Sequence, residues 1–338
     1  MSVGYVAMVS RALGVALASV LLVPATVGAC AIFSPAARDV RVQGEEVLIV
    51  WDAANRREHL VRHIGFEGSA ENFGFVVPTP SEPEVAEVRG RPFDGLYRLY
   101  RRPERRSRSR SSAPSMRASS MSSLAAPVEV VARHHVAGQT ATVLRASDAA
   151  ALDRWLATHG YPSGAALARY LGPYVERGWY LTAFRYDKAQ RRRALSPALR
   201  LSFDTERPFF PYAEPHRRTR ARPFRLSVVA AQPMNGLLEN LRGEGARRWS
   251  ARVGYRAPLR AVDARGILGA AGITPPAGSL HLTVFDEPAS RRGTRDLFFV
   301  EAPGAPDVAP RLRTRIVPPR RGRRAPAGND ELQVPEFQ

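Results

Sequence analysis

The stretch from Val128 to Asp187 decides the expected fold: VEVVARHHVAGQTATVLRASDAAALDRWLATHGYPSGAALARYLGPYVERGWYLTAFRYD. Its first part, residues 128–145, alternates apolar and polar side chains on either side of a turn at Gly138, which predicts a β-hairpin. Ser147 or Asp148 then precedes apolar residues at helical spacing. An oxygen side chain at that position caps the first turn, so a helix is expected next.

The second half of this stretch predicts a short helix followed by a strand. The helix is expected over residues 163–171, with Gly172 and Pro173 stopping or kinking it. Residues 179–186 carry aromatic side chains on both faces, which is typical of a strand covered on both sides. Packing explains these rings more simply than a ligand cleft does, because each ring buries a large apolar area.

Further strands and one helix are expected outside this stretch. Apolar runs bounded by turn residues predict strands at 46–51, 58–67, 71–77, 198–204, 224–231, 280–285 and 297–300, the last two as a pair. Residues 235–249 are expected to be helical despite their glycines. Together these elements predict an α+β fold, a mainly antiparallel β-sheet with a few short helices packed on it.

The composition divides the chain into five segments. They are a signal peptide at 1–29, the N-terminal β-rich part of the core at 30–100, a disordered Arg/Ser-rich insertion at 101–126, an α+β core at 127–302 and a disordered basic tail at 303–338. The insertion and the tail lack the apolar surface that would offset the entropy of ordering them. Whether the two core segments share one sheet or form two domains stays open.

The first 29 residues have the pattern of a secretory signal peptide. Arg11 precedes the uncharged apolar run 12–23, and small residues lead from there to Ala29. The run is too short to cross ~30 Å of hydrocarbon. We therefore expect cleavage, no transmembrane helix in the mature chain, and export to the periplasm or to the surface of the outer or cell membrane.

Cys30 is the only cysteine of the chain. It follows Val27-Gly28-Ala29, which resembles a bacterial lipobox, and this resemblance implies a lipid anchor on the Cys30 thiol. Two acyl chains hold a protein stably at a membrane, where one is marginal. The alternative is ordinary cleavage after Ala29 that leaves Cys30 without lipid. In both cases an intramolecular disulfide is impossible.

The formal net charge of +19 is concentrated in two segments. Residues 101–117 hold seven arginines and one acid, and residues 311–324 hold seven arginines and no acid. An exported chain rarely meets nucleic acid, so we do not expect nucleic acid as its partner. An unknown envelope partner or an anionic surface, such as lipid headgroups or polysaccharide, fits these basic segments better.

Catalytic and metal-binding motifs are missing from the sequence. None of H-E-x-x-H, C-x-x-C, G-x-S-x-G or G-x-x-x-x-G-K-[ST] occurs, and no cofactor is expected. His59 and His63 could share a metal on a helix, but on the expected strand they lie ~13 Å apart. His134 and His135 are adjacent on a strand, so they point to opposite faces and do not form a chelating pair.

Two functions from different classes remain. The first is a non-enzymatic envelope protein with a binding or structural role. The second is an exported hydrolase whose site is assembled from scattered residues, its catalytic residues being unknown. That hydrolase needs an acid in one pocket with at least two of His134, His135, His159, His216 and His281. A functional surface is expected where the end of the 73–80 strand meets the aromatic strand.

Five pieces of the sequence carry a family resemblance. They are VLIVWD (47–52), IGFEGSAENFGFVVPTPSEPEV (64–85), VEVVARHHVAGQTATVL (128–144), DAAALDRWLATHGY (148–161) and YVERGWYLTAFRYD (174–187). In this order and spacing they are similar to the bacterial domain of unknown function 2330 family, over roughly residues 30–230. The resemblance implies export and a shared fold, but it does not indicate what chemistry the protein performs. Family members often have a second cysteine just after the signal, which this chain lacks.

Overall fold

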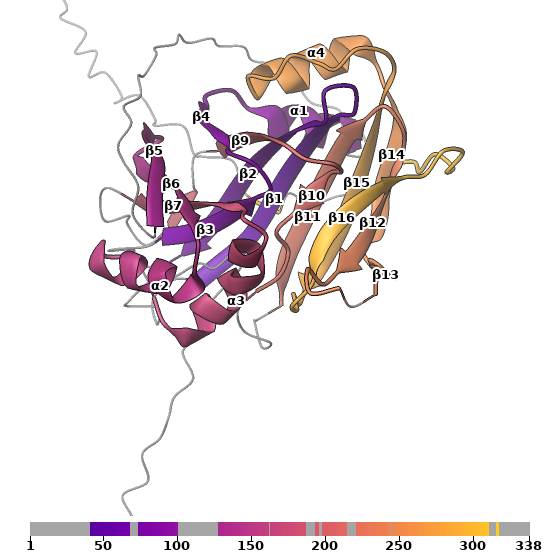
Figure 1. Ribbon diagram of the computed structural model, residues 1–338. Helices are drawn as coiled ribbons and strands as arrows, with labels where there is room; N and C mark the ends of the chain where they lie inside the picture. Colours follow the sequence, from indigo (N-terminus) through magenta and orange to yellow (C-terminus); the bar gives the residue numbers. More distant parts are fainter. Residues whose placement is uncertain are drawn as a thin grey trace, which may run out of the picture.

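The computed structural model describes residues 41–67, 74–100, 128–161, 163–186, 193–195, 198–214, 221–243, 245–310 and 316–317. In this part of the chain, sixteen strands and four helices form three β-sheets with helices on their outer faces (Figure 1). The strand pairing is antiparallel except between β1 and β11, within the same described residues. The predicted α+β fold, mainly antiparallel β with short helices, is confirmed.

The large sheet has eight strands. Its order is β14 (Arg252–Leu259), β15 (Leu280–Ser290), β11 (Arg222–Ala230), β1 (Arg41–Asp52), β2 (Arg57–Glu67), β9 (Ala198–Asp204) and β4 (Glu84–Val88), with β8 (Arg193–Leu195) also paired to β2. Its central strand β1 is buried on both faces. Val47, Ile49 and Trp51 face one core cluster while Leu48 and Val50 face another. The continuous apolar run of β1 follows from this two-sided burial.

Two four-stranded sheets lie against the inner face of the large sheet. One has the order β3 (Gly74–Thr79), β7 (Tyr180–Tyr186), β6 (Gln139–Ala146) and β5 (Val128–Val136). The other has the order β10 (Phe209–Phe210), β16 (Asp296–Glu301), β12 (Met234–Glu239) and β13 (Arg247–Arg248). A single apolar cluster joins all three sheets, so the main core lies between them.

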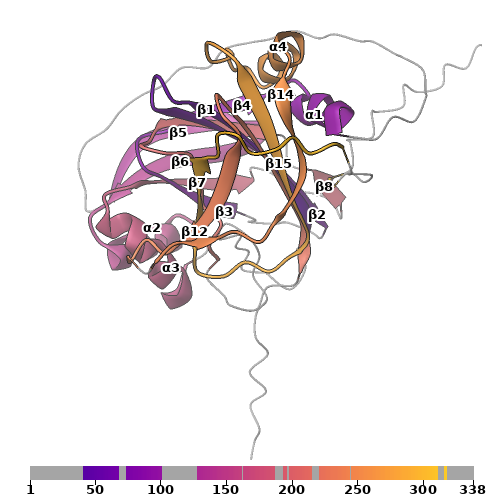
Figure 2. The same cartoon turned by 90° about the vertical axis from the view of Figure 1, so that its right-hand side faces the viewer.

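Helices close the two outer faces. α1 (Pro92–Tyr100) and α4 (Ala261–Ala270) cover the large sheet, and α2 (Ala149–Thr158) and α3 (Ala165–Glu176) cover the sheet of β3, β7, β6 and β5 (Figures 1 and 2). The result is a layered molecule: helices, the large sheet, the two small sheets, and helices again. Among the described residues, none of these helices has the length and apolarity to cross a membrane.

The structure confirms most of the expected elements between 128 and 187. The hairpin forms as β5 and β6. Asp148 caps α2, because its carboxylate accepts the backbone N–H groups of Ala150 and Ala151 at 3.2 and 2.7 Å. Of the two expectations for Gly172 and Pro173, a stop or a kink, the stop is wrong, since α3 continues through Pro173 to Glu176. Burial of side chains on both sides of the proline compensates for its missing N–H donor.

Two expectations for the C-terminal half are wrong. Residues 235–249 form strands β12 and β13 instead of a helix, and β12 alternates buried and half-buried residues. Gly236 allows the close approach of Trp249, because a Cβ there would lie 2.7 Å from the indole. The strands at 280–285 and 297–300 do not pair with each other. β15 pairs with β11 and β14, while β16 pairs with β12 and β10.

Both predicted core segments contribute to the same sheets. β1 and β2, from the segment 30–100, pair with β11 and β9, and β3 pairs with β7. Part of the predicted tail packs on this body, since Val308 bridges to Arg256. The predicted signal peptide, Cys30 and the insertion 101–126 lie outside the described residues, as does most of the tail beyond 310.

Candidate functional site

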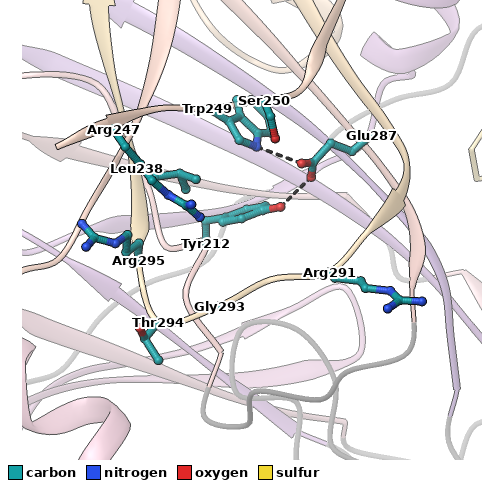
Figure 3. Close-up of a pocket in the computed structure, with 10 residues that line it drawn as sticks. All are labelled: Tyr212, Leu238, Arg247, Trp249, Ser250, Glu287, Arg291, Gly293, Thr294 and Arg295. Atoms are coloured by element: carbon teal, nitrogen blue, oxygen red, sulfur yellow. Dashed lines mark hydrogen bonds between the residues drawn. The ribbon is translucent and has the colours of Figure 1, made fainter.

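One polar cavity, the arginine cavity, opens between the small sheet of β12, β13 and β16 and the end of β15 (Figure 3). Its volume is about 230 Å³. Three arginines contribute to its wall and an acid, a tyrosine and a tryptophan to its floor. The described lining residues are Tyr212, Leu238, Arg247, Trp249, Ser250, Glu287, Arg291, Gly293, Thr294 and Arg295.

Glu287 organises the floor of the arginine cavity. Its carboxylate accepts hydrogen bonds from the Tyr212 hydroxyl at 2.5 Å and the Trp249 indole N–H at 3.0 Å. Burial raises the pKa of Tyr212, and the neighbouring Glu287 raises it further. The hydroxyl therefore stays protonated and remains a donor to Glu287. Two hydrogen bonds from within the protein therefore hold the Glu287 carboxylate in place and stabilise its negative charge.

The arginines form the rim. Arg295 donates to the carbonyl of Gly245 at 2.6 Å. Arg247 and Arg291 are exposed, and neither guanidinium forms a hydrogen bond or ion pair with a described residue. In Figure 3, Arg291 lies on the opposite side of the cavity from Arg247 and Arg295. Three arginines and one engaged glutamate leave the cavity positive, and a guanidinium fork matches phosphate and carboxylate groups.

A second polar cavity, the histidine cavity, lies between the β5–β6 hairpin, the end of α2 and β7. Its volume is about 430 Å³. Two arginines, two histidines, hydroxyl groups and aromatic rings surround it. The described lining residues are Arg133, His135, Thr140, Thr142, Trp155, Thr158, His159, Tyr161 and Arg185.

The expected hydrolase site requires two histidines and an acid in one pocket, and the histidine cavity supplies only the histidines. His135 and His159 both line it, but none of its described lining residues is an acid. His134 points to the other face of β5, and His281 is hydrogen-bonded to the carbonyl of Ala231 at 3.1 Å. His216 lies outside the described residues. In the described lining of the histidine cavity, two of the named histidines therefore meet without an acid.

The other pair of histidines shows no sign of metal binding. His59 and His63 lie on β2, as expected. His59 is hydrogen-bonded to the Ser202 hydroxyl at 2.7 Å, and burial, with Arg200 and Arg57 nearby, lowers its pKa to about 4. His63 stacks on Phe93 at 5.7 Å between ring centroids. No group of three or more His, Cys, Asp or Glu in the described ranges could hold a metal ion.

A set of buried charges, the interior ion cluster, lies between the sheets and behind the arginine cavity. Its members are Glu45, Arg62, Glu214, Arg222 and Arg292. Glu45 contacts Arg62 and Arg292, each at 2.5 Å. Burial by itself would raise the pKa of Glu45, but Arg292, Arg62 and Arg222 together lower it to about 2. All five members are shielded from solvent, so the cluster is structural.

Sequence reasoning missed both cavities. The two strands β3 and β7 do pair, as expected, and a functional surface where they meet stays a prediction. Neither polar cavity is lined by a described residue of β3, however. The Glu45-Glu46 pair directly before the apolar run of β1 was a signal for the interior ion cluster, because acids on a buried strand need buried arginines, but it did not indicate either cavity.

Comparison with known proteins identifies a family. The profile of an uncharacterized protein conserved in bacteria (DUF2330) matches residues 24–238. The chain belongs to this family. The match confirms the resemblance noted from the sequence, and every lining residue of the histidine cavity falls within it. The arginine cavity of this DUF2330 protein combines Tyr212 and Leu238 with residues beyond the matched range.

Other comparisons add little to the family assignment. No curated protein matches the chain. Among solved structures, a crystal structure of baculovirus P35 is 9% identical to it, with a TM-score of 0.37. That alignment covers 79% of this chain and 98% of the other. A likeness at this level supports no statement about function.

Proposed function

We propose that this DUF2330 protein is an exported protein of the bacterial cell envelope that binds a phosphate-bearing envelope component at the arginine cavity without transforming it. The observation that carries the proposal is the pair Arg247 and Arg291. Both are exposed on the cavity rim, and neither is neutralised by a described carboxylate. The only acid among the described lining residues, Glu287, is already engaged by Tyr212 and Trp249.

Export and anchoring rest on the N-terminal sequence. The signal pattern before Ala29 supports secretion, and Val27-Gly28-Ala29-Cys30 supports acylation of the Cys30 thiol. Cell fractionation is expected to find the chain in the envelope, and mass analysis of the mature N-terminus is expected to show acylated Cys30. A Cys30→Ser variant should be released from the membrane fraction. Recovery of the wild-type chain in the cytoplasm would contradict export, and a mature Cys30 without added mass would contradict the anchor.

The binding proposal is tested by calorimetric titration of the purified full chain with glycerol 3-phosphate, and with glycerol as the neutral probe. We expect the phosphate ester to bind and glycerol not to bind. The double variant Arg247→Gln/Arg291→Gln should weaken binding by tenfold or more, because hydrogen bonds to charged groups contribute about 1.5–3 kcal/mol each. Arg248→Gln is the matched control, since Arg248 is exposed on the same strand but does not line the cavity.

The matched control separates the cavity from the general positive charge of the chain. The Arg-rich segments attract any anion without specificity. Their contribution to binding is therefore the same in all variants, and it decreases as the salt concentration rises. Equal weakening by Arg248→Gln and by the double variant would mean that only general charge is at work. No binding of glycerol 3-phosphate to the wild type would also reject the proposal.

A further inference from the structure

The sheet face under α2 changes character where that helix ends. On this face Leu144 and Ala146 of β6 belong to an apolar cluster that packs under α2 and α3. Two and four residues before Leu144, at Thr142 and Thr140, the same face becomes polar. Strand β7 behaves alike, since apolar Leu181 and Ala183 give way to Arg185. The polar end forms the floor of the histidine cavity.

Register places the polar side chains of three strands in one row. Thr140 of β6 is paired with His135 of β5 on one side and with Arg185 of β7 on the other. Directly paired residues present their side chains to the same face, and neighbouring strands lie about 4.8 Å apart. The row therefore runs His135, Thr140, Arg185, and Arg133 lies beside it opposite Thr142. Within this row His135 and Thr140 are hydrogen-bonded to each other, between Nδ1 and Oγ1 at 3.3 Å. The row together with Arg133 can present N–H donors to one anion.

The aromatic wall comes from the end of α2. Trp155 stacks on His159 with ring centroids 4.0 Å apart, and on Tyr161 at 5.7 Å. Arg185 fixes this end of the helix, because its guanidinium donates to the carbonyl of His159 at 3.0 Å and lies 5.5 Å from the Tyr161 ring centroid. Tyr161 is also hydrogen-bonded to Thr142 of the floor at 3.2 Å. Wall and floor are thus held together before any ligand arrives.

The positive charge of the histidine cavity favours an anionic ligand. The guanidinium of Arg133 is exposed and forms no hydrogen bond or ion pair with any described side chain, and no acid occurs among the described lining residues. We infer that the histidine cavity binds a cyclic carboxylate, such as the uronic acid unit of an envelope polysaccharide or a free sugar acid. The carboxylate is held by Arg133 and the row of donors, and the ring lies against the aromatic wall. This site is separate from the arginine cavity and does not depend on phosphate binding there; only the envelope source of its ligand rests on the export proposed above.

The test is titration of the full chain with glucuronate, with glucose as the neutral counterpart, at constant ionic strength. Glucuronate is expected to bind with a Kd of about 1 mM or tighter and to shift the imidazole NMR signals of His135 and His159. Glucose should do neither. Arg133→Gln should weaken binding about tenfold. Arg145→Gln is the control, because Arg145 is an exposed arginine on the opposite face of the same sheet.

Further controls and outcomes show whether the inference holds. The double variant Arg247→Gln/Arg291→Gln should keep glucuronate binding while it loses glycerol 3-phosphate binding, so the two proposals can fail separately. Both Arg133 and Arg145 are exposed, and unchanged melting temperatures would show that their variants fold. Equal response to glucose and glucuronate, equal loss in the Arg145→Gln control, or unshifted His135 and His159 signals would each overturn the inference. Polymeric polyglucuronate in a parallel titration distinguishes a polysaccharide source from a free sugar acid.

Discussion

Arg291 and Arg292 are neighbours in the loop between β15 and β16, yet one is exposed to solvent and the other is buried in an ion pair. Arg292 is 2% exposed and contacts Glu45 of the interior ion cluster at 2.5 Å. Arg291 is exposed on the rim of the arginine cavity and forms no ion pair with a described residue. The difference shows that an arginine-rich composition has two uses here, one for holding the fold and one for presenting charge.

The surroundings of Arg292 explain why it tolerates burial. Its guanidinium lies 4.3, 4.8 and 5.5 Å from the ring centroids of Phe224, Tyr212 and Phe210. Charge–quadrupole attraction and the Glu45 carboxylate together offset the loss of water. Tyr212 also supplies the hydroxyl that binds Glu287, so one side chain connects the interior ion cluster with the floor of the arginine cavity.

The largest expected effect is the difference in stability between the Arg292→Ala and Arg291→Ala variants. Arg292→Ala should lower the free energy of unfolding by about 3–5 kcal/mol, because it leaves Glu45 buried without one of its two close arginines. Arg291→Ala should change it by no more than ~0.5 kcal/mol, as exposed substitutions usually do. Urea unfolding followed by circular dichroism measures both. Similar losses in the two variants would break the comparison.

A second prediction tests the carboxylate of the interior ion cluster. Glu45→Gln keeps the shape of the side chain but removes its charge, and should cost about 3 kcal/mol at pH 7. The pKa of Glu45 is about 2 in the fold, against an ordinary value of 4.5. Its stabilising contribution is therefore complete above pH 4.5 and is lost as the pH falls toward 2. Unfolding curves at pH 7 and pH 3 should show the gap between wild type and variant narrowing at the lower pH.

A third prediction concerns a buried acid that has no arginine beside it. Burial raises the pKa of Asp296 to about 7, even though its carboxylate accepts bonds from Tyr174 and from the Ala213 N–H. Its contribution is full below pH 3.8 and declines as the pH rises through 7, the reverse of Glu45. Asp296→Asn keeps partners for both groups, so it should gain about 1–2 kcal/mol at pH 8 relative to wild type. A constant difference between pH 5 and pH 8 would contradict this assignment.

The smallest expected effect on stability is at the rim. Arg247→Gln and Arg291→Gln, singly or together, should shift the free energy of unfolding by less than ~1 kcal/mol, while weakening glycerol 3-phosphate binding as proposed above. Thermal melts beside the calorimetric titrations give both quantities for the same samples. A large loss of stability in these variants would mean that the rim arginines hold the fold together as the arginines of the interior ion cluster do.

Much of the fold could be predicted because its signals are local. Asp148 before an apolar periodic run marked the start of α2, and Gly160, with φ of 71°, ended it. The strand 179–186 was recognisable from aromatic side chains on both of its faces. The error at 235–249 also has a local origin, because its spacing of leucines suits a helix as well as a strand. Pairing with β16 on one side and β13 on the other makes Leu238 a strand residue.

The candidate sites could not be predicted, because no segment contains one. The arginine cavity joins Tyr212 to residues of β13 and of the loop after β15, and the histidine cavity exists only because α2 ends above the row of His135, Thr140 and Arg185. The sequence by itself determined most of the elements, the positive charge, the signal pattern and the family resemblance. Tertiary structure alone decided which arginines are paired. Coulomb attraction and desolvation depend on distances through space, and Arg291 and Arg292 are identical in everything except what lies next to them.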